Sequence, residues 1–203
     1  MKILDIGSAT GYPFIDYLYD KKIDIYGIDV SEKLINECRK KYPNSNLSVS
    51  SAENLSFESN FFDMIYCFHT TWHFEDFFKS IKEMFRAIKD DGKIIIDVMN
   101  ADNEEMKKVF FIKCIKDIIK KIIYYPFSFF KYGRLKNPVI HYEKPVSVAK
   151  FNRFLYDRKI IFKMFVFNED NLKEINTNEK INNHSRLIYI IQKENILSQE
   201  VIN

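Results

Sequence analysis

Short apolar runs alternate with helix-like apolar spacings along the first hundred residues. Each run has the length of a buried strand, and the runs lie at residues 2–6, 23–29, 47–51, 61–69 and 94–99. Between the runs, apolar residues recur at the spacing of amphipathic helices. The clearest such set is Phe77, Ile81, Met84, Phe85 and Ile88. Strands that alternate with helices predict a parallel, doubly wound α/β sheet.

The last third of the chain has a different pattern. Two apolar runs, Lys159 to Phe167 and Arg186 to Gln192, are joined by a polar segment rich in Asn and Glu, without a helical pattern between them. Strands joined without a crossover helix pair antiparallel. The whole pattern therefore predicts a doubly wound, mostly parallel Rossmann-like sheet that ends in an antiparallel strand pair, within one domain that spans residues 1–203.

The first strand runs into a loop of glycines and small residues. Gly7, Ser8, Ala9 and Gly11 separate this strand from the helical spacing that begins at Phe14. Glycine tolerates positive φ and lets a ligand approach the backbone closely. Because the loop joins the carboxyl end of a strand to the amino end of a helix, we expect it to hold a nucleotide-like group.

The spacing of the loop distinguishes between kinds of nucleotide. A dinucleotide fingerprint reads Gly-x-Gly-x-x-Gly, whereas this chain reads Asp5-x-Gly7-x-Ala9-x-Gly11. A carboxylate before the loop repels a phosphate but can pair with an ammonium group, such as the amino-acid end of S-adenosylmethionine. The motif resembles the Asp/Glu-x-Gly-x-Gly-x-Gly motif of class I S-adenosylmethionine-dependent methyltransferases, from which it departs at Ala9.

This resemblance implies a set of cofactor-binding residues. Asp29 follows the second strand, about 20 residues after the loop, where a carboxylate can bind the ribose hydroxyls. The segment that starts at Ser51 resembles the family's adenine-binding motif, with a hydroxyl in place of the usual acid. The expected cofactor-binding residues are Asp5, Gly7, Ser8, Ala9, Gly11, Asp29, Val30, Ser51, Ala52, Glu53, Cys67 and Phe68.

Methyl transfer requires positioning of the acceptor, a dry pocket and, for some acceptors, a base. Histidine is the natural base near neutral pH. His69 and His73 lie at the carboxyl end of the fourth strand, and His141 and Tyr142 lie where the resemblance implies substrate contacts. We therefore expect His69 and His141 to be catalytic and His73 and Tyr142 to bind the substrate. The expected reaction transfers a methyl group from S-adenosylmethionine to an O or N atom of a small-molecule acceptor, without a metal.

Cysteine usage and hydropathy indicate the compartment. Cys38, Cys67 and Cys114 are widely spaced, form no Cys-x-x-Cys pair and lie among apolar residues, so we expect reduced core thiols. The sequence shows no signal peptide and no apolar run of bilayer length. These features predict a cytoplasmic protein.

One segment carries most of the basic charge. Residues 107–136 contain nine Lys or Arg and one Asp, a net of +8, so the rest of the chain carries −5 of the total of +3. Within it, Lys107 to Tyr125 has the pattern of a basic amphipathic helix, which we expect to end at Pro126. We expect an insert at about 103–145 that packs as a lid. Weak contact with anionic lipid or with a lipid-linked substrate is the alternative, and nucleic acid fits less well.

Two other functions share part of the pattern. An NAD-dependent oxidoreductase has the glycine turn and Asp29, but neither Asp5 nor the antiparallel strand pair. A non-catalytic, methyltransferase-like binding subunit is favoured by Ala9, by Ser51 and by a first strand that starts at Lys2, since family members usually carry a helix ahead of it. The resemblance therefore predicts that the chain lacks this helix.

Overall fold

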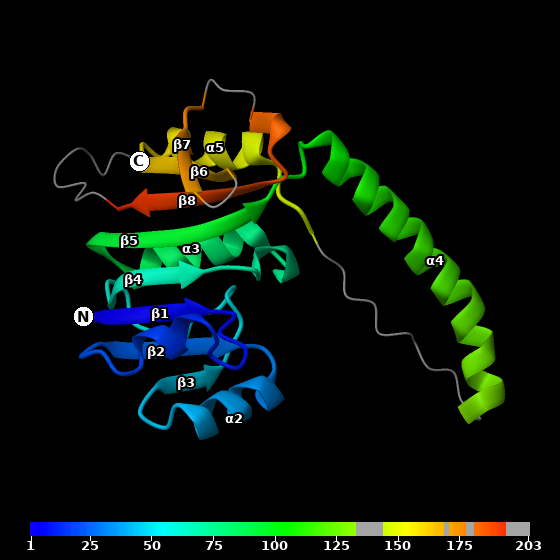
Figure 1. The fold of residues 1–203 in the computed structure, drawn as a ribbon, viewed down its shortest axis with the longest axis horizontal. Coiled ribbons are helices and arrows are strands. Elements are labelled where there is room, and N and C mark those ends of the chain that lie inside the picture. Colours follow the sequence, from blue (N-terminus) through cyan, green and yellow to red (C-terminus); the bar gives the residue numbers. More distant parts are fainter. Residues whose placement is uncertain (133–143, 169–170, 178–180, 194–203) are drawn as a thin grey trace, which may run out of the picture.

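The computed structural model describes residues 1–132, 144–168, 171–177 and 181–193. Its centre is an eight-stranded sheet in the order β3-β2-β1-β4-β5-β8-β6-β7 (Figure 1). The first five strands run parallel, and β8, β6 and β7 are antiparallel to their neighbours. The predicted α/β class, with a parallel sheet that ends in antiparallel strands, is confirmed.

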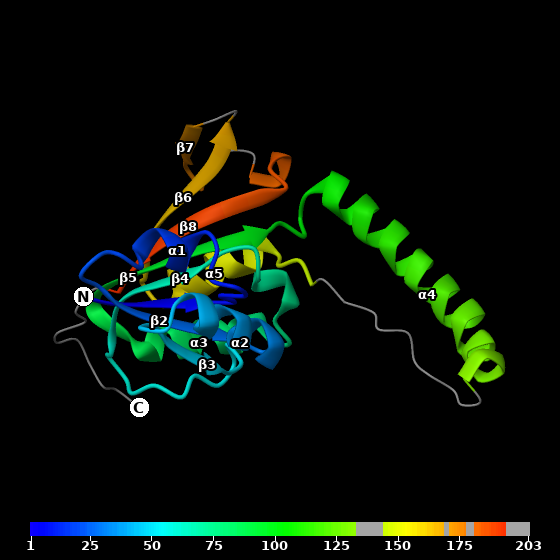
Figure 2. The ribbon, with the colours of Figure 1, turned by 60° about the horizontal axis from the view of Figure 1, so that its bottom comes forward.

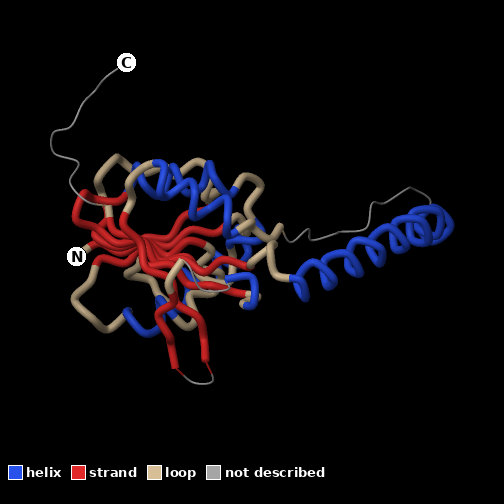
Figure 3. Tube along the Cα trace, turned by 90° about the horizontal axis from the view of Figure 1, so that it is seen from above, coloured by secondary structure: helices blue, strands red, loops and turns tan. Residues whose placement is uncertain are grey.

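Helices connect the parallel strands and cover both faces of the sheet (Figure 3). The strands are β1 (Lys2–Ile6), β2 (Asp24–Asp29), β3 (Asn46–Val49), β4 (Phe62–Cys67), β5 (Ile88–Met99), β6 (Ile161–Asn168), β7 (Asn171–Ile175) and β8 (Arg186–Gln192). The helices are α1 (Phe14–Leu18), α2 (Glu32–Lys41), α3 (Phe77–Ala87), α4 (Glu104–Tyr132) and α5 (Val148–Asp157), with short 3-10 turns η1 (Thr71–His73) and η2 (Ile181–Asn183).

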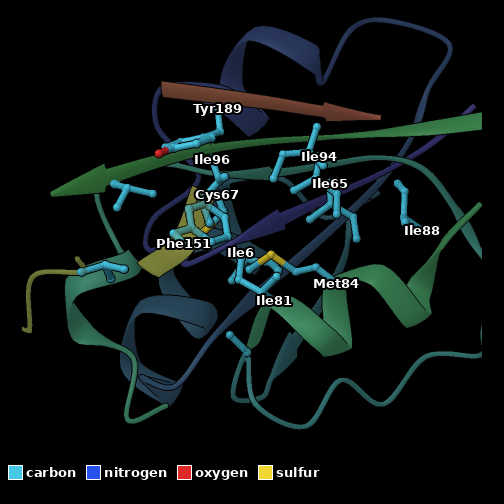
Figure 4. Close-up of a cluster of buried hydrophobic side chains, with 14 of the residues drawn as sticks. Ile6, Ile65, Cys67, Ile81, Met84, Ile88, Ile94, Ile96, Phe151 and Tyr189 are labelled. Carbon is cyan, nitrogen blue, oxygen red and sulfur yellow. The ribbon is translucent and has the colours of Figure 1, made fainter. Parts of the chain in front are cut away.

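Alternate residues of the strands pack into two hydrophobic clusters on opposite faces of the sheet. Leu4 belongs to the larger cluster, under α3 and α5, whereas its neighbour Ile3 belongs to the cluster under α1 and α2. Figure 4 shows part of the larger cluster, where Met84 of α3 and Phe151 of α5 meet the sheet. This burial on both faces explains why the parallel strands appear in the sequence as continuous apolar runs.

Several element boundaries differ from the predictions. The polar segment between the last two apolar runs contains β7, an edge strand that is largely exposed and that pairs with β6 through the backbone. The strand expected at 94–99 begins earlier, as β5 at Ile88. Within it, Ile88 to Lys93 advances five residues while β4 advances two, from Phe62 to Met64. The extra residues form an irregularity in the strand and not a turn between elements.

A short turn precedes helix α3. Thr71–His73 forms η1, and α3 begins at Phe77 because the Asp76 carboxylate accepts a hydrogen bond from Lys79 N at 3.0 Å. Ser31 likewise caps α2, since its hydroxyl accepts a hydrogen bond from Leu34 N.

Helix α4 leaves the sheet after β5 and projects away from the body of the domain (Figures 1 and 2). It continues through Pro126, where it was expected to end, to Tyr132. A proline removes one backbone donor, which can bend a helix without ending it. Cys114 on α4 is exposed, unlike the core thiols Cys38 and Cys67, so its predicted burial is wrong. Within the described ranges, none of the helices is long and apolar enough to cross a bilayer.

Candidate cofactor site

The loop after β1 is held against the end of β2 by its own backbone. Gly7 N and Ser8 N donate to the carbonyl oxygen of Ile28 at 2.8 and 2.9 Å, and Gly11 N donates to Ser8 O at 2.7 Å. Gly7 and Gly11 have φ of 77° and 87°, a region that favours glycine. The local sequence therefore fixes a tight turn at the carboxyl end of β1.

Neighbouring side chains also require glycine at these two positions. A Cβ on Gly7 would lie 2.4 Å from Thr70 Oγ1, and a Cβ on Gly11 would lie 2.5 Å from the Tyr42 ring. Thr70 follows β4 and Tyr42 follows α2, so the loop is in close contact with elements on both sides. Gly7 thus lets the backbone approach the segment after β4, while Gly11 serves the packing of the loop on α2.

Asp29 joins the loop to the end of β2. Its Oδ2 accepts a hydrogen bond from Ala9 N at 3.1 Å, and its Oδ1 accepts from Ser31 N at 2.8 Å. Ala9 has φ of 46°, in the left-handed region, which an alanine adopts at some cost. The carboxylate therefore holds the one loop position at which the chain departs from the family motif.

A cavity of about 750 Å³ opens at the carboxyl ends of β1 to β4. Nine of the expected site residues line it, and they come from the glycine loop and from the segments after β2, β3 and β4. These residues are Gly7, Ala9, Asp29, Val30, Ser51, Ala52, Glu53, His69 and His73. The cavity is also lined by Ile6, Ile28, Leu34, Ser50, Thr70, Phe74 and Glu75, which were not expected from the sequence. Thr70 could have been inferred, because a residue after β4 faces the loop in this topology.

The remaining expected residues of the described chain lie outside the cavity lining. Cys67 is fully buried in the larger hydrophobic cluster, and burial raises the pKa of its thiol. Phe68 stacks on Tyr66 with ring centroids 4.6 Å apart. Ser8 is buried, and its Oγ has no hydrogen-bond partner within the described chain. Gly11 packs on α2, as above.

Asp5 also lies outside the lining, because it is buried in the inner strand β1 and only 5% exposed. Burial, and next the charge of Asp29, raise its pKa to about 7. A carboxyl group with this pKa changes its charge near neutral pH. His141 and Tyr142 fall outside the described residues.

Glu53 holds two loops together at the end of the cavity that the segment after β3 lines. Its Oε1 accepts from Glu75 N at 2.8 Å and from Asp76 N at 3.3 Å, and Ser51 Oγ donates to its other oxygen. Burial alone would raise the pKa of Glu53, but these hydrogen bonds outweigh it and keep the pKa below its usual value. Glu53 is therefore ionised at neutral pH, and it ties the segment after β3 to the start of α3.

A charged network, absent from the expected set, surrounds His69. The backbone N of His69 donates to Asp97 Oδ1 at 2.9 Å, and the guanidinium of Arg186 binds Asp97 Oδ2. Arg186 also lies over Trp72, 5.5 Å from the ring centroid. Burial, and next the positive charge of Arg186, lower the pKa of His69. The imidazole is thus neutral at neutral pH and can accept a proton.

Comparisons with known proteins agree with this geometry. Residues 4–96 match the family described as "Methyltransferase domain". The chain is 30% identical over 151 residues to a demethylmenaquinone methyltransferase of Chlorobaculum tepidum, which covers 73% of this chain and 62% of the relative. An uncharacterized methyltransferase of Bacillus subtilis, YcgJ, is 27% identical over 103 residues, which is 47% of this chain and 39% of the relative. The chain thus spans less than two thirds of these relatives' length.

Solved structures show the same fold. A SAM-dependent methyltransferase from Thermotoga maritima aligns with a TM-score of 0.60 and 18% identity, over 95% of this chain and 82% of that one. The YcgJ structure from Bacillus subtilis aligns with a TM-score of 0.60 and 14% identity, over 95% and 92%. The family match over the glycine loop and β1 to β5, together with this fold, shows that the chain carries a class I S-adenosylmethionine-dependent methyltransferase domain.

Proposed function

We propose that this chain transfers a methyl group from S-adenosylmethionine to a small-molecule acceptor. The observation that carries the proposal is the cavity at the carboxyl ends of the parallel strands, where Gly7, Asp29 and the segment after β3 come together. Ligands of open α/β sheets bind in this position. Bound there, the cofactor supplies an activated methyl group on a sulfonium.

The residues present fit such a cofactor. Asp29 uses one lone pair of each oxygen for Ala9 N and Ser31 N, which leaves acceptor positions for two ribose hydroxyls. Because Gly7 has no side chain, its backbone is accessible at the cavity wall. A side chain at this position would collide with Thr70. Ala52 and Ser51 line the cavity after β3, and we assign them to the adenine end.

His69 is the proposed base where an acceptor must lose a proton. It lines the cavity, and burial and Arg186 keep its imidazole neutral, so a ring nitrogen can take the proton of an acceptor hydroxyl or amine. His73 lines the same cavity and is proposed to contact the acceptor. The side-chain roles of His141 and Tyr142 stay predictions.

The acceptor atom is the part of the proposal with two candidates. The sequence favoured an O or N acceptor. The relatives favour carbon instead, since one from Wigglesworthia glossinidia brevipalpis, 31% identical over 103 residues, is named a ubiquinone/menaquinone biosynthesis C-methyltransferase. With a carbon acceptor, the carbon that receives the methyl group must afterwards lose its own proton. His69 would then accept this proton after the methyl transfer.

Isothermal titration tests the cofactor. We expect S-adenosylhomocysteine and S-adenosylmethionine to bind and NAD to bind far more weakly, because the loop lacks the Gly-x-Gly-x-x-Gly spacing of dinucleotide-binding sites. Tighter binding of NAD would contradict the proposal. Incubation with labelled cofactor and with quinol, hydroxyl or amine acceptors then tests turnover. Binding of S-adenosylhomocysteine without transfer to any of these classes would favour the non-catalytic subunit.

A further inference from the structure

The direction in which α4 leaves the domain is fixed by buried polar side chains. Asn100 is fully buried, and its Nδ2 donates to the carbonyl oxygens of Ile181 and His184 at 3.2 and 2.9 Å. Asn103 is 5% exposed, and its Oδ1 accepts from Met106 N at 2.9 Å in the first turn of α4. These bonds hold the start of the helix against η2.

Three more hydrogen bonds fix the same segment, one to η2 and two to the start of α5. Asn103 Nδ2 donates to Asn182 O at 2.7 Å. Asp102 Oδ2 accepts from Ser147 Oγ and from Ala149 N, both at 3.0 Å, at the start of α5. These hydrogen bonds, most of them part-buried, fix residues 100–103 and the first turn of α4. They therefore fix the direction in which α4 starts.

The projecting helix exposes one continuous apolar stripe. Its five described members are 42–68% exposed, and their spacing (i, i+1, i+4, i+7 and i+8) places them on one side of the helix, within about 60° of Ile115. They are Phe111 (68% exposed), Ile112 (52%), Ile115 (42%), Ile118 (52%) and Ile119 (48%). We call these five residues the α4 stripe. An exposed apolar surface of this kind marks an interaction site.

Basic residues border the α4 stripe. Lys108 lies at its N-terminal end, and the exposed Lys107 and Lys116 lie along its two edges at helical spacing. Long lysine side chains at such edges keep their charge in the aqueous phase while the stripe is buried. The sequence of residues 107–136 has a net charge of +8, whereas the rest of the chain carries −5.

We propose that α4 is a docking surface for an anionic lipid membrane, on which it lies with the α4 stripe in the headgroup region. A helix with an apolar side, basic edges and too little hydrophobicity to span is of the interfacial kind. A second copy of the chain is the less fitting partner, because two such helices, each with seven Lys and three acidic residues, would bring two basic segments together. The inference does not depend on the proposed function.

The position of α4 gives the docking a consequence for the site. Helix α4 lies on the side of the domain toward which β1 and β4 point (Figure 1), and the cavity opens at the carboxyl ends of these strands. A membrane under α4 would therefore lie on the side of the cavity. The remainder of the chain is acidic, so electrostatic attraction to an anionic surface is confined to the α4 segment.

Flotation of the full chain with lipid vesicles tests the proposal. We expect binding to phosphatidylcholine vesicles that contain phosphatidylglycerol, weak binding to phosphatidylcholine alone, and a loss of binding as salt is added. Ile115→Asp, in the middle of the α4 stripe, should lower the partition coefficient about tenfold or more, because it removes buried apolar area and adds a charge at the headgroup boundary.

Val109→Asp is the matched control. Val109 is on the same helix, is 54% exposed and lies about 120° around the helix from Ile115. It changes the charge equally but leaves the α4 stripe intact, so we expect a loss of less than about threefold. Equal losses in the two variants, or no binding to the anionic vesicles, would overturn the proposal. So would a dimer that Ile115→Asp dissociates, or protection of α4 from amide exchange by S-adenosylhomocysteine without lipid.

Discussion

Asp97 on β5 and Arg186 on β8 form an ion pair across neighbouring antiparallel strands, and Asp97 at the same time binds the backbone of His69 after β4. Asp97 is fully buried and the Arg186 side chain is 28% exposed. The pair thus connects the antiparallel end of the sheet to the segment that carries the proposed base. Asp97 and Arg186 act as positioning residues, since neither lines the cavity.

Asp97→Asn should destabilise the fold. The amide can still accept from His69 N but cannot neutralise Arg186, which is left unpaired in a half-buried position. Because water reaches part of the guanidinium, we expect a loss of about 2–4 kcal/mol in the free energy of unfolding, below the range for a fully buried pair. Denaturant unfolding measures it.

Asp157→Asn provides the control. Asp157 pairs with Arg153 at 3.7 Å on the surface of α5, and both side chains are largely exposed. Exposed pairs contribute less than about 1 kcal/mol. If both variants lost the same small amount, the Asp97 pair would have no structural role beyond that of a surface ion pair.

Asp29→Ala should weaken binding of S-adenosylhomocysteine. The carboxylate is proposed to accept hydrogen bonds from the ribose hydroxyls, and such charge-assisted bonds contribute about 1–3 kcal/mol. Isothermal titration at fixed pH measures the dissociation constant, and circular dichroism shows whether the fold is kept. The variant also removes the acceptor for Ala9 N, so a moderate loss of stability accompanies it.

Asp24→Ala is matched to this variant, because Asp24 lies at the opposite, exposed end of the same strand β2. It should leave the dissociation constant unchanged. An equal effect of the two substitutions, or no effect of Asp29→Ala, would remove Asp29 from the site.

Local sequence patterns predicted the parallel part of the sheet because its strands are buried on both faces. Ile3 and Leu4 pack on opposite sides, so three of the five positions of β1 are apolar, and the run is recognisable from the sequence. The glycine loop was predictable for a similar reason, since its φ angles require particular residues. In contrast, β7 is an exposed edge strand whose pairing depends on β6 and not on its own pattern.

Contacts between distant residues limited the prediction of the site. Asp97 and Arg186 are 89 residues apart, and neither belongs to a sequence motif from which the other could be predicted. Cys67 ends β4 and Phe68 follows it, but the sequence does not say that the Cys67 side chain faces the core and that the Phe68 ring stacks on Tyr66. Asp29, Ser51 and His69 were found because the carboxyl ends of parallel strands meet at one edge.

Gly7→Ala should strongly destabilise the protein. The new Cβ would lie 2.4 Å from Thr70 Oγ1, and φ of 77° is unfavourable for alanine. The backbone cost of about 1–2 kcal/mol and the overpacking cost of about 1–3 kcal/mol add to an expected loss of about 2–5 kcal/mol. Thermal unfolding measures the change.

Ala9→Gly is the opposite change two residues away. Glycine removes the backbone strain that alanine has at a φ of 46°, but it also increases the conformational entropy of the unfolded chain. The two effects nearly cancel, so the free energy of unfolding should change by less than about 1 kcal/mol. A loss from Ala9→Gly as large as that from Gly7→Ala would contradict the assignment of the steric demand to Gly7.

Asp5 should make stability depend on pH. Its pKa is raised from 3.8 to about 7 by burial and, to a lesser extent, by the charge of Asp29. A folded-state pKa above the unfolded value means that the folded state holds its proton more tightly. The stabilisation from Asp5 is therefore fully present below pH 3.8 and is lost as pH rises to about 7, by up to about 4 kcal/mol in total.

Asp5→Asn cannot titrate, so the free energy of unfolding of the wild type minus that of this variant should fall through this window and level off above it. Asp29→Ala removes the second cause and should move the upper end of the window to lower pH. A difference that stays flat from pH 3.8 to 7 would show that Asp5 is ionised throughout, with a solvated or paired carboxylate in place of a buried one.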